Sequence, residues 1–179
     1  CFARLTERGK PAGPDNAHDA GEAIGPIAGD RVDAMYGFNK RPAVAHLATA
    51  RTKGPGGKFG FQIFGSTGTI AMGTGWLPPA FLLSSPVWNG TAKGSKWVEI
   101  GSEGPGKPEP LSGDPLVEGN RAVVADLIHA VETDTQPRAS VYDGRAAVEM
   151  ILACYASSIK NGPVSFPLAD RDRHPLESA

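Results

Sequence analysis

The architecture depends most on the stretch Phe59-Gly60-Phe61-Gln62-Ile63-Phe64-Gly65-Ser66-Thr67-Gly68-Thr69-Ile70-Ala71-Met72. Aromatic and β-branched residues alternate on both sides of the Gly65–Gly68 segment, which has the composition of a tight turn. Two strands joined by so short a link must run antiparallel, because a parallel pair needs a crossover of a dozen or more residues.

The same two-residue alternation continues outward from this hairpin. It predicts strands joined by Gly- and Pro-rich turns at Cys1–Thr6, Arg31–Phe38, Ala43–Arg51, Ala80–Leu83 and Lys96–Ile100, and a last short strand at Val164–Phe166. The stretch from Glu7 to Gly29 is expected to be loop.

Beyond the strands the period changes to that of an amphipathic helix. Apolar residues recur on one face between Asn120 and Asp134, and again between Asp143 and Asn161, and Asn120 and Asp143 are suitable N-caps. The predicted fold is α+β: one mainly antiparallel open sheet of about six or seven strands, with two C-terminal helices packed on one face. The polar tail from Asp170 to Ala179 is expected to fray.

Composition narrows the class of protein. The 179 residues favour a single domain over residues 1–179, and 18 Lys and Arg against 19 Asp and Glu leave no basic excess for nucleic acid. No apolar stretch is long enough to span a membrane, so no membrane partner is expected. Cys1 and Cys154 are expected to be two buried thiols, since two cysteines make no disulfide scaffold.

The motifs of familiar sites do not match. Gly73-Thr74-Gly75-Trp76-Leu77-Pro78 lacks the third glycine and the following helix of a dinucleotide fingerprint, and Gly65-Ser66-Thr67-Gly68 is no nucleophile elbow. Asp126 and His129 share a helix face, but a solvent-facing pair is favoured over a metal pair. No catalytic, cofactor-binding or metal-binding residue is therefore assigned.

Two surface features suggest partners. Phe59, Phe61 and Ile63 share one strand face, while Gln62 and Phe64 share the other. Apolar residues on each face predict that the sheet is covered on both sides, by an oligomer contact or by a missing domain. The tryptophans Trp76, Trp88 and Trp97 flank an irregular stretch, where they can fill an interface or stack on sugar rings.

The order of the pieces in the C-terminal third carries a resemblance. Asn120-Arg121-Ala122-Val123-Val124-Ala125-Asp126-Leu127-Ile128-His129-Ala130-Val131-Glu132 is followed by Gln136-Pro137, by Ser140-Val141-Tyr142-Asp143-Gly144-Arg145-Ala146-Ala147-Val148-Glu149-Met150, by Pro163–Leu168, and by Arg171 with His174-Pro175-Leu176. With the hairpin at 61–70, this resembles the C-terminal domain of the glucose–fructose oxidoreductase / inositol dehydrogenase (Gfo/Idh/MocA) family.

The resemblance implies the substrate and oligomerisation part of an NAD(P)-dependent oxidoreductase that acts on a sugar, polyol or related compound. NAD or NADP would be bound by an N-terminal Rossmann domain absent from this chain, and the family's Glu-Lys-Pro lysine has no counterpart here: Lys10-Pro11 and Lys107-Pro108 follow glycine. Asp170 and His174 have the spacing of the family's Asp-x-x-x-His pair but lie after the last expected strand, so the match is read as coincidence. The fragment alone is expected to be inactive.

His46 and Arg51 are the candidate substrate-binding residues, because both can hydrogen-bond a polyol from one strand. Their odd spacing places them on opposite faces, so only one of them should line a cleft. Two alternatives from other classes stay open: a non-catalytic scaffold that forms homo-oligomers through the sheet face, and a carbohydrate-binding module that uses the tryptophans.

Overall fold

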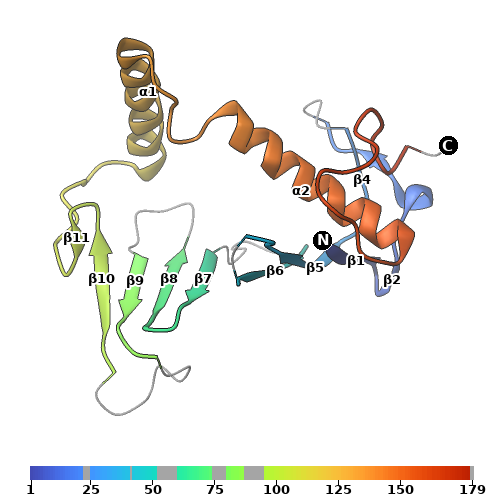
Figure 1. Ribbon diagram of the computed structural model, residues 1–179, viewed down its shortest axis with the longest axis horizontal. Coiled ribbons are helices and arrows are strands. Elements are labelled where there is room, and N and C mark those ends of the chain that lie inside the picture. Colours follow the sequence, from blue (N-terminus) through green and yellow to red (C-terminus); the bar gives the residue numbers. More distant parts are fainter. Residues whose placement is uncertain (22–24, 41, 52–59, 74–79, 87–94, 178–179) are drawn as a thin grey trace. The chain divides into compact units, whose positions relative to one another are not determined.

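The structure is a computed structural model that describes residues 1–21, 25–40, 42–51, 60–73, 80–86 and 95–177 (Figure 1). The chain divides into two compact units, one formed by Cys1–Lys53 with Ala139–Ala179 and the other by Gly54–Arg138. The strands are β1 (Phe2–Glu7), β2 (Lys10–Pro11), β3 (His18–Asp19), β4 (Pro26–Ile27), β5 (Arg31–Gly37), β6 (Val44–Ala50), β7 (Gly60–Phe64), β8 (Thr69–Gly73), β9 (Ala80–Leu83), β10 (Trp97–Gly101) and β11 (Gly104–Pro105). A 3₁₀ turn at Pro14–Asn16 and the helices α1 (Pro115–Thr133) and α2 (Val141–Lys160) complete the elements.

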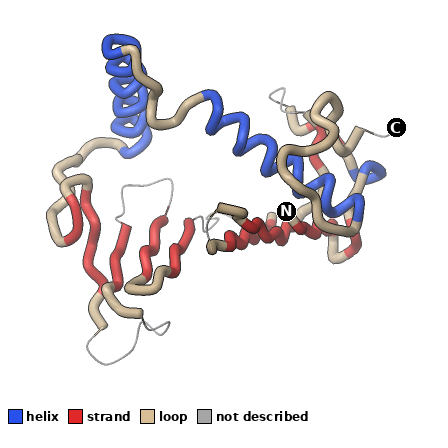
Figure 2. The backbone as a smooth tube through the Cα atoms, in the orientation of Figure 1, coloured by secondary structure: helices blue, strands red, loops and turns tan. Residues whose placement is uncertain are grey.

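Every strand pair among the described residues is antiparallel, which confirms the α+β fold class with open antiparallel sheets and two C-terminal helices. The strands form two main sheets instead of one: β2-β1-β5-β6 in the first unit and β11-β10-β9-β8-β7 in the second, with a separate β3-β4 hairpin (Figure 2). Alternation identifies strands but does not say which edges pair, and this is why the division was not foreseen.

The first unit is built around β1 and α2. The core consists of side chains from the inner face of the sheet and from the helix, namely Ala3, Leu5, Ala12, Ala34, Tyr36 and Cys154. Leu5 is 2% exposed, and α2 packs directly on β1. This packing agrees with the helix-on-sheet layer expected from the sequence.

Two serines of α2 also close the outer edge of β1. The backbone N–H of Ala3 donates to Ser157 Oγ at 2.8 Å, and the N–H of Leu5 donates to Ser158 Oγ at 3.0 Å. Cys1 exchanges two backbone hydrogen bonds with Val164, and β2 pairs with the end of β1 at Thr6 and Glu7. Most of this edge is therefore hydrogen-bonded without a full neighbouring strand.

The second unit is a strand meander followed by α1. Asp114 caps this helix by accepting the backbone N–H groups of Leu116 and Val117. Five large apolar residues of α1 are more than half exposed, although Ala130 is buried; the five are Val123, Val124, Leu127, Ile128 and Val131. Among the described elements, α2 is the helix that packs extensively on a strand, and that strand is β1.

Four local expectations were wrong. The stretch from Glu7 to Gly29, expected to be loop, contains β2, the 3₁₀ turn, β3 and β4. The segment Val164–Phe166 contributes no strand beyond the single Cys1–Val164 bridge, because prolines flank it and remove backbone donors. The helices begin earlier than Asn120 and Asp143, at Pro115 and Val141. The described part of the tail, residues 170–177, is docked: Leu176 is 3% exposed, and Leu168 just before the tail is 9% exposed.

Neither described helix combines the length and apolarity needed to cross a bilayer.

Candidate functional site

The outer face of the β1-β5-β6 sheet carries a polar row, which we call the polar face: Arg4, Arg31, Asp33 and His46. Residues directly opposite each other on paired strands share a face of the sheet. Arg4 lies opposite Asp33, and His46 lies opposite Met35. Because Met35 is two residues from Asp33 on β5, His46 is on the same face as Asp33. β1 and β5 place the opposite alternation, including Leu5 and Ala34, on the core, whereas β6 contributes only Ala45 and leaves Leu47 and Thr49 exposed. The polar face is open, and its reverse is packed along β1 and β5.

An ion pair orders this row. Arg31 donates to Asp33 through Nε at 2.7 Å and through Nη2 at 3.3 Å. The Arg31 hydrogen bond is the main cause that lowers the pKa of Asp33, and the charge of His46 lowers it further. Asp33 therefore presents a carboxylate beside an imidazole, a pair that can accept from and donate to neighbouring hydroxyl groups.

The structure separates the two candidate substrate residues. His46 lies on the polar face, and its side chain is exposed. Arg51 lies just beyond the last residue of β6, where its backbone N–H donates to the carbonyl of Asp30 at 2.6 Å. The placement of the two side chains on opposite faces stays a prediction. Met35 lies directly opposite His46, and the charge of His46 acts on Asp33.

The other sequence candidates do not come together as sites. Asp126 accepts the backbone N–H of Arg138 at 2.8 Å and lies 3.7 Å from its guanidinium, so it ties the end of α1 to the following loop. The described part of the chain holds no cluster of three potential metal ligands. Trp76 and Trp88 lie outside the described residues, and Trp97 is 38% exposed on β10.

Cys154 is a buried thiol, as expected, whereas Cys1 is only half-buried. The Tyr36 hydroxyl lies 2.9 Å from Cys154 Sγ and donates to the Met150 carbonyl at 3.1 Å. Burial is the main cause that raises the pKa of both the thiol and the phenol. A protonated, enclosed thiol is a poor nucleophile, so this pair serves the core.

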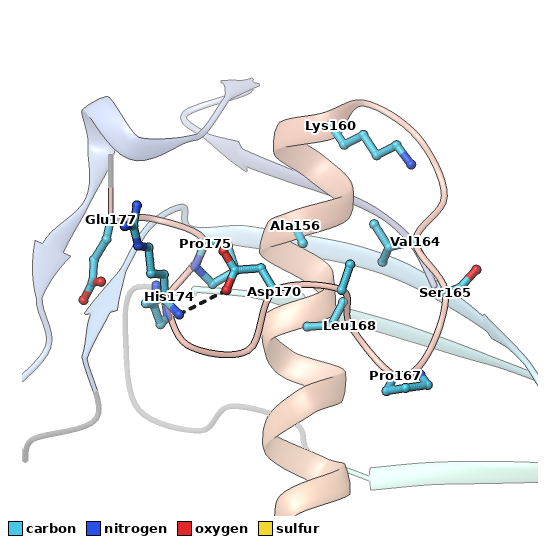
Figure 3. A pocket seen from close by; sticks show the side chains of 12 residues that line it. Ala156, Lys160, Val164, Ser165, Pro167, Leu168, Asp170, His174, Pro175 and Glu177 are labelled. Atoms are coloured by element: carbon cyan, nitrogen blue, oxygen red, sulfur yellow. Dashed lines mark hydrogen bonds between the residues drawn. The ribbon is translucent and has the colours of Figure 1, made fainter. Parts of the chain in front are cut away.

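The sequence did not predict a cavity of about 550 Å³ between α2 and the C-terminal segment (Figure 3). The segment is fixed to α2 because Glu149 accepts the N–H of Leu168 at 2.7 Å and the guanidinium of Arg171 at 2.8–2.9 Å. These contacts, the Leu168 bond first, lower the pKa of Glu149. The apolar Leu168 and Leu176 within the polar tail were the signal for this docking.

His174 is held on one side of this cavity. Its ring lies 5.4 Å from the ring of Tyr155, and the backbone N–H of Leu176 donates to its Nδ1 at 3.2 Å. In the neutral ring Nε2 therefore carries the hydrogen. Burial lowers the pKa of His174 below its ordinary 6.5.

The pKa of His174 predicts a dependence of stability on pH. Because the folded state favours neutral imidazole, His174 contributes stability above about pH 6.5 that is lost as the pH falls through its folded pKa. We expect its NMR titration midpoint to lie below 6.5. His174→Asn, which keeps an acceptor for the Leu176 N–H, should flatten the acid side of the stability curve; a midpoint at or above 6.5 would contradict the prediction.

Comparison of the chain with protein-family models, with curated proteins and with solved structures found no match. The class defined here is that of an open antiparallel α+β protein, and the family resemblance stays a prediction.

Proposed function

We propose that this chain is the substrate-binding and oligomerisation domain of an NAD(P)-dependent oxidoreductase that acts on a sugar, polyol or related compound in the cytoplasm. The observation that supports this best is the polar face, where His46 and Asp33 offer a donor and an acceptor on an open antiparallel sheet. Neighbouring hydroxyl groups of a polyol need this combination of hydrogen-bonding partners.

The described residues do not fit a nicotinamide dinucleotide. All their strand pairs are antiparallel, so they contain no strand–turn–helix–strand unit of the parallel kind that cradles a pyrophosphate. In the proposed enzyme a separate domain binds NAD or NADP and supplies the hydride chemistry. This chain orients the substrate.

The polyol site can be tested with myo-inositol, D-glucose and xylitol, titrated into the isotopically labelled chain. We expect saturable NMR shifts centred on His46, and His46→Ala should weaken binding about tenfold, the scale of one lost hydrogen-bonding group. Thr49→Ala, at an exposed position on the opposite face of β6, is the matched control. Arg51→Ala should also leave binding unchanged.

Three outcomes would contradict this proposal. Shifts that map to Arg51 and vanish in Arg51→Ala would move the substrate to the other face. The absence of saturable shifts with every polyol would remove the site. Saturable binding of NADH, followed by its fluorescence, would contradict a cofactor carried on a separate domain.

The proposed oligomer contact is the apolar face of the five-stranded sheet. The register places eight apolar residues on this face: Phe61, Ile63, Ile70, Met72, Ala80, Leu82, Val98 and Ile100. None of them is fully buried, and Phe61 and Ile63 are 46% and 53% exposed. A second copy of the same uncharged face is self-complementary, which is what a two-fold dimer requires.

A charge placed in this face should disrupt the dimer. Ile63→Asp, at a half-exposed edge position, should raise the dimer dissociation constant about a hundredfold or more, because an unpaired carboxylate would be buried. Light scattering over a concentration series measures the change. Gln62→Asp, next to it but on the opposite face, is the control. A wild-type chain that stays monomeric at high concentration would contradict the proposal.

A second candidate function, carbohydrate binding, rests on the opposite face of the same sheet. Phe64, Phe81 and Trp97 are 52%, 38% and 38% exposed there, beside the polar side chains of Gln62 and Glu99. Exposed aromatic rings beside an amide and a carboxylate can stack on and hydrogen-bond a sugar. Glucose binding that survives His46→Ala and is lost in Trp97→Ala would favour this function.

A further inference from the structure

The cavity beside α2 has charges of both signs at its rim. Its lining includes the cations Lys160 and Arg173 and the carboxylates Asp170 and Glu177. Figure 3 shows Lys160 and Ser165 on one side of Ala156, with Asp170, His174 and Glu177 on the other. Ala156 lies between these two groups, and its small side chain leaves room for the cavity.

These charges are not neutralised by one another. In the described part of the chain, none of the four belongs to an ion pair within 4.0 Å. Lys160 donates to the carbonyl of Pro163 at 3.2 Å, and Asp170 Oδ1 accepts the backbone N–H groups of Asp172 and Arg173 at 3.0 and 3.4 Å. In the described part of the chain no hydrogen bond or ion pair holds the Arg173 guanidinium, the Glu177 carboxylate or Asp170 Oδ2, and the charge of Glu177 acts on the His174 ring.

Four of the ionisable residues that line the cavity are close together in the sequence. Asp170, Arg173, His174 and Glu177 lie on one short segment, so a cation and an imidazole N–H are close in sequence to two carboxylates. The formal charges balance, which disfavours a phosphate or another simple polyanion. A ligand that carries a carboxylate and an ammonium group on neighbouring atoms would match both signs.

We propose that this cavity binds the head group of a free α-amino acid. The ligand carboxylate pairs with Arg173 and with the Nε2–H of His174, and the ligand ammonium pairs with Asp170 and Glu177. The ligand side chain extends over Ala156 toward Lys160 and Ser165, whose charge and hydroxyl group favour an acidic or amide end. This site is separate from the polar face and does not depend on the oxidoreductase function.

The test uses the full chain, with L-glutamate as the probe and two analogues that each lack one charge. Glutarate has no ammonium group, and γ-aminobutyrate has no α-carboxylate. We expect saturable NMR shifts at Ala156 and His174 with L-glutamate, and binding of each analogue at least about tenfold weaker. Arg173→Gln and Glu177→Gln should weaken L-glutamate binding by a similar factor.

Controls separate a specific loss from a general one. Arg173 and Glu177 are exposed, so their variants should keep the circular dichroism spectrum of the parent. Arg138→Gln, an exposed arginine in the other unit, should bind L-glutamate unchanged. Lys160→Gln should reduce the preference for L-glutamate over L-glutamine.

The proposal is overturned if L-glutamate gives no saturable shift, or if either single-charge analogue binds as tightly. It is also overturned if Arg173→Gln and Arg138→Gln behave alike. Saturable binding of myo-inositol in this cavity, in place of L-glutamate, would assign it to neutral polyols, whereas polyol shifts at His46 concern only the proposed function.

Discussion

Leu5→Ala is expected to lower the free energy of unfolding of the first unit by about 2–5 kcal/mol. Leu5 is 2% exposed in the core of this unit, where small neighbours such as Ala3 and Ala34 cannot move in to fill the volume it leaves. The loss therefore includes both the transfer of the removed methyl groups and the cavity that remains. Denaturant titration followed by circular dichroism measures it.

Leu47→Ala is the matched control for this substitution. Leu47 has the same side chain on the same sheet, but it is 42% exposed on β6. Its replacement should cost less than about 1 kcal/mol. Equal losses for the two variants would mean that β1 and α2 do not form the core described here.

Ser157→Ala is expected to cost about 2–4 kcal/mol, a large loss for the removal of one oxygen atom. Ser157 has no exposed surface, and its hydroxyl accepts the N–H of Ala3 and donates to the carbonyl of Gly162, both at 2.8 Å. Alanine leaves the buried N–H of Ala3 and the half-buried carbonyl of Gly162 without this partner. The same denaturant titration gives the magnitude.

The neighbouring Ser158→Ala should cost about half as much, because its hydroxyl serves one backbone group, the N–H of Leu5. Double replacement tests whether the two hydroxyls act independently on the β1 edge. A loss in Ser157→Ala no larger than in Ser158→Ala would show that the Gly162 contact contributes nothing.

The strands were the most predictable part of the fold. Period-two alternation located β1, β5, β6, β7, β8, β9 and β10 to within one or two residues, because half-buried strands need that pattern. The predicted starts of the two helices were less accurate. The N-caps are Asp114, which precedes a proline, and Ser140, which forms a capping box with Asp143, and these local signals outweighed the apolar periodicity.

The candidate sites also differed in how far the sequence predicted them. The sequence located His46 on a strand correctly, since side-chain alternation in a strand is a local property, whereas Arg51 lies just beyond the end of β6. The cavity beside α2 depends on Glu149, which binds Leu168 and Arg171 some twenty residues later. Such a contact leaves no periodic trace, so a polar tail that wraps a helix was mistaken for a frayed end.

The hydrogen bonds along the outer edge of β1 have a consequence for aggregation. Strand edges with free N–H and carbonyl groups recruit strands from other molecules, and this is how many β-proteins begin to form fibrils. Here a foreign strand could reach Ala3 and Leu5 only after Ser157 and Ser158 had moved away. Release of α2 should therefore precede fibril growth from this edge, and the helix acts as a kinetic barrier against self-association.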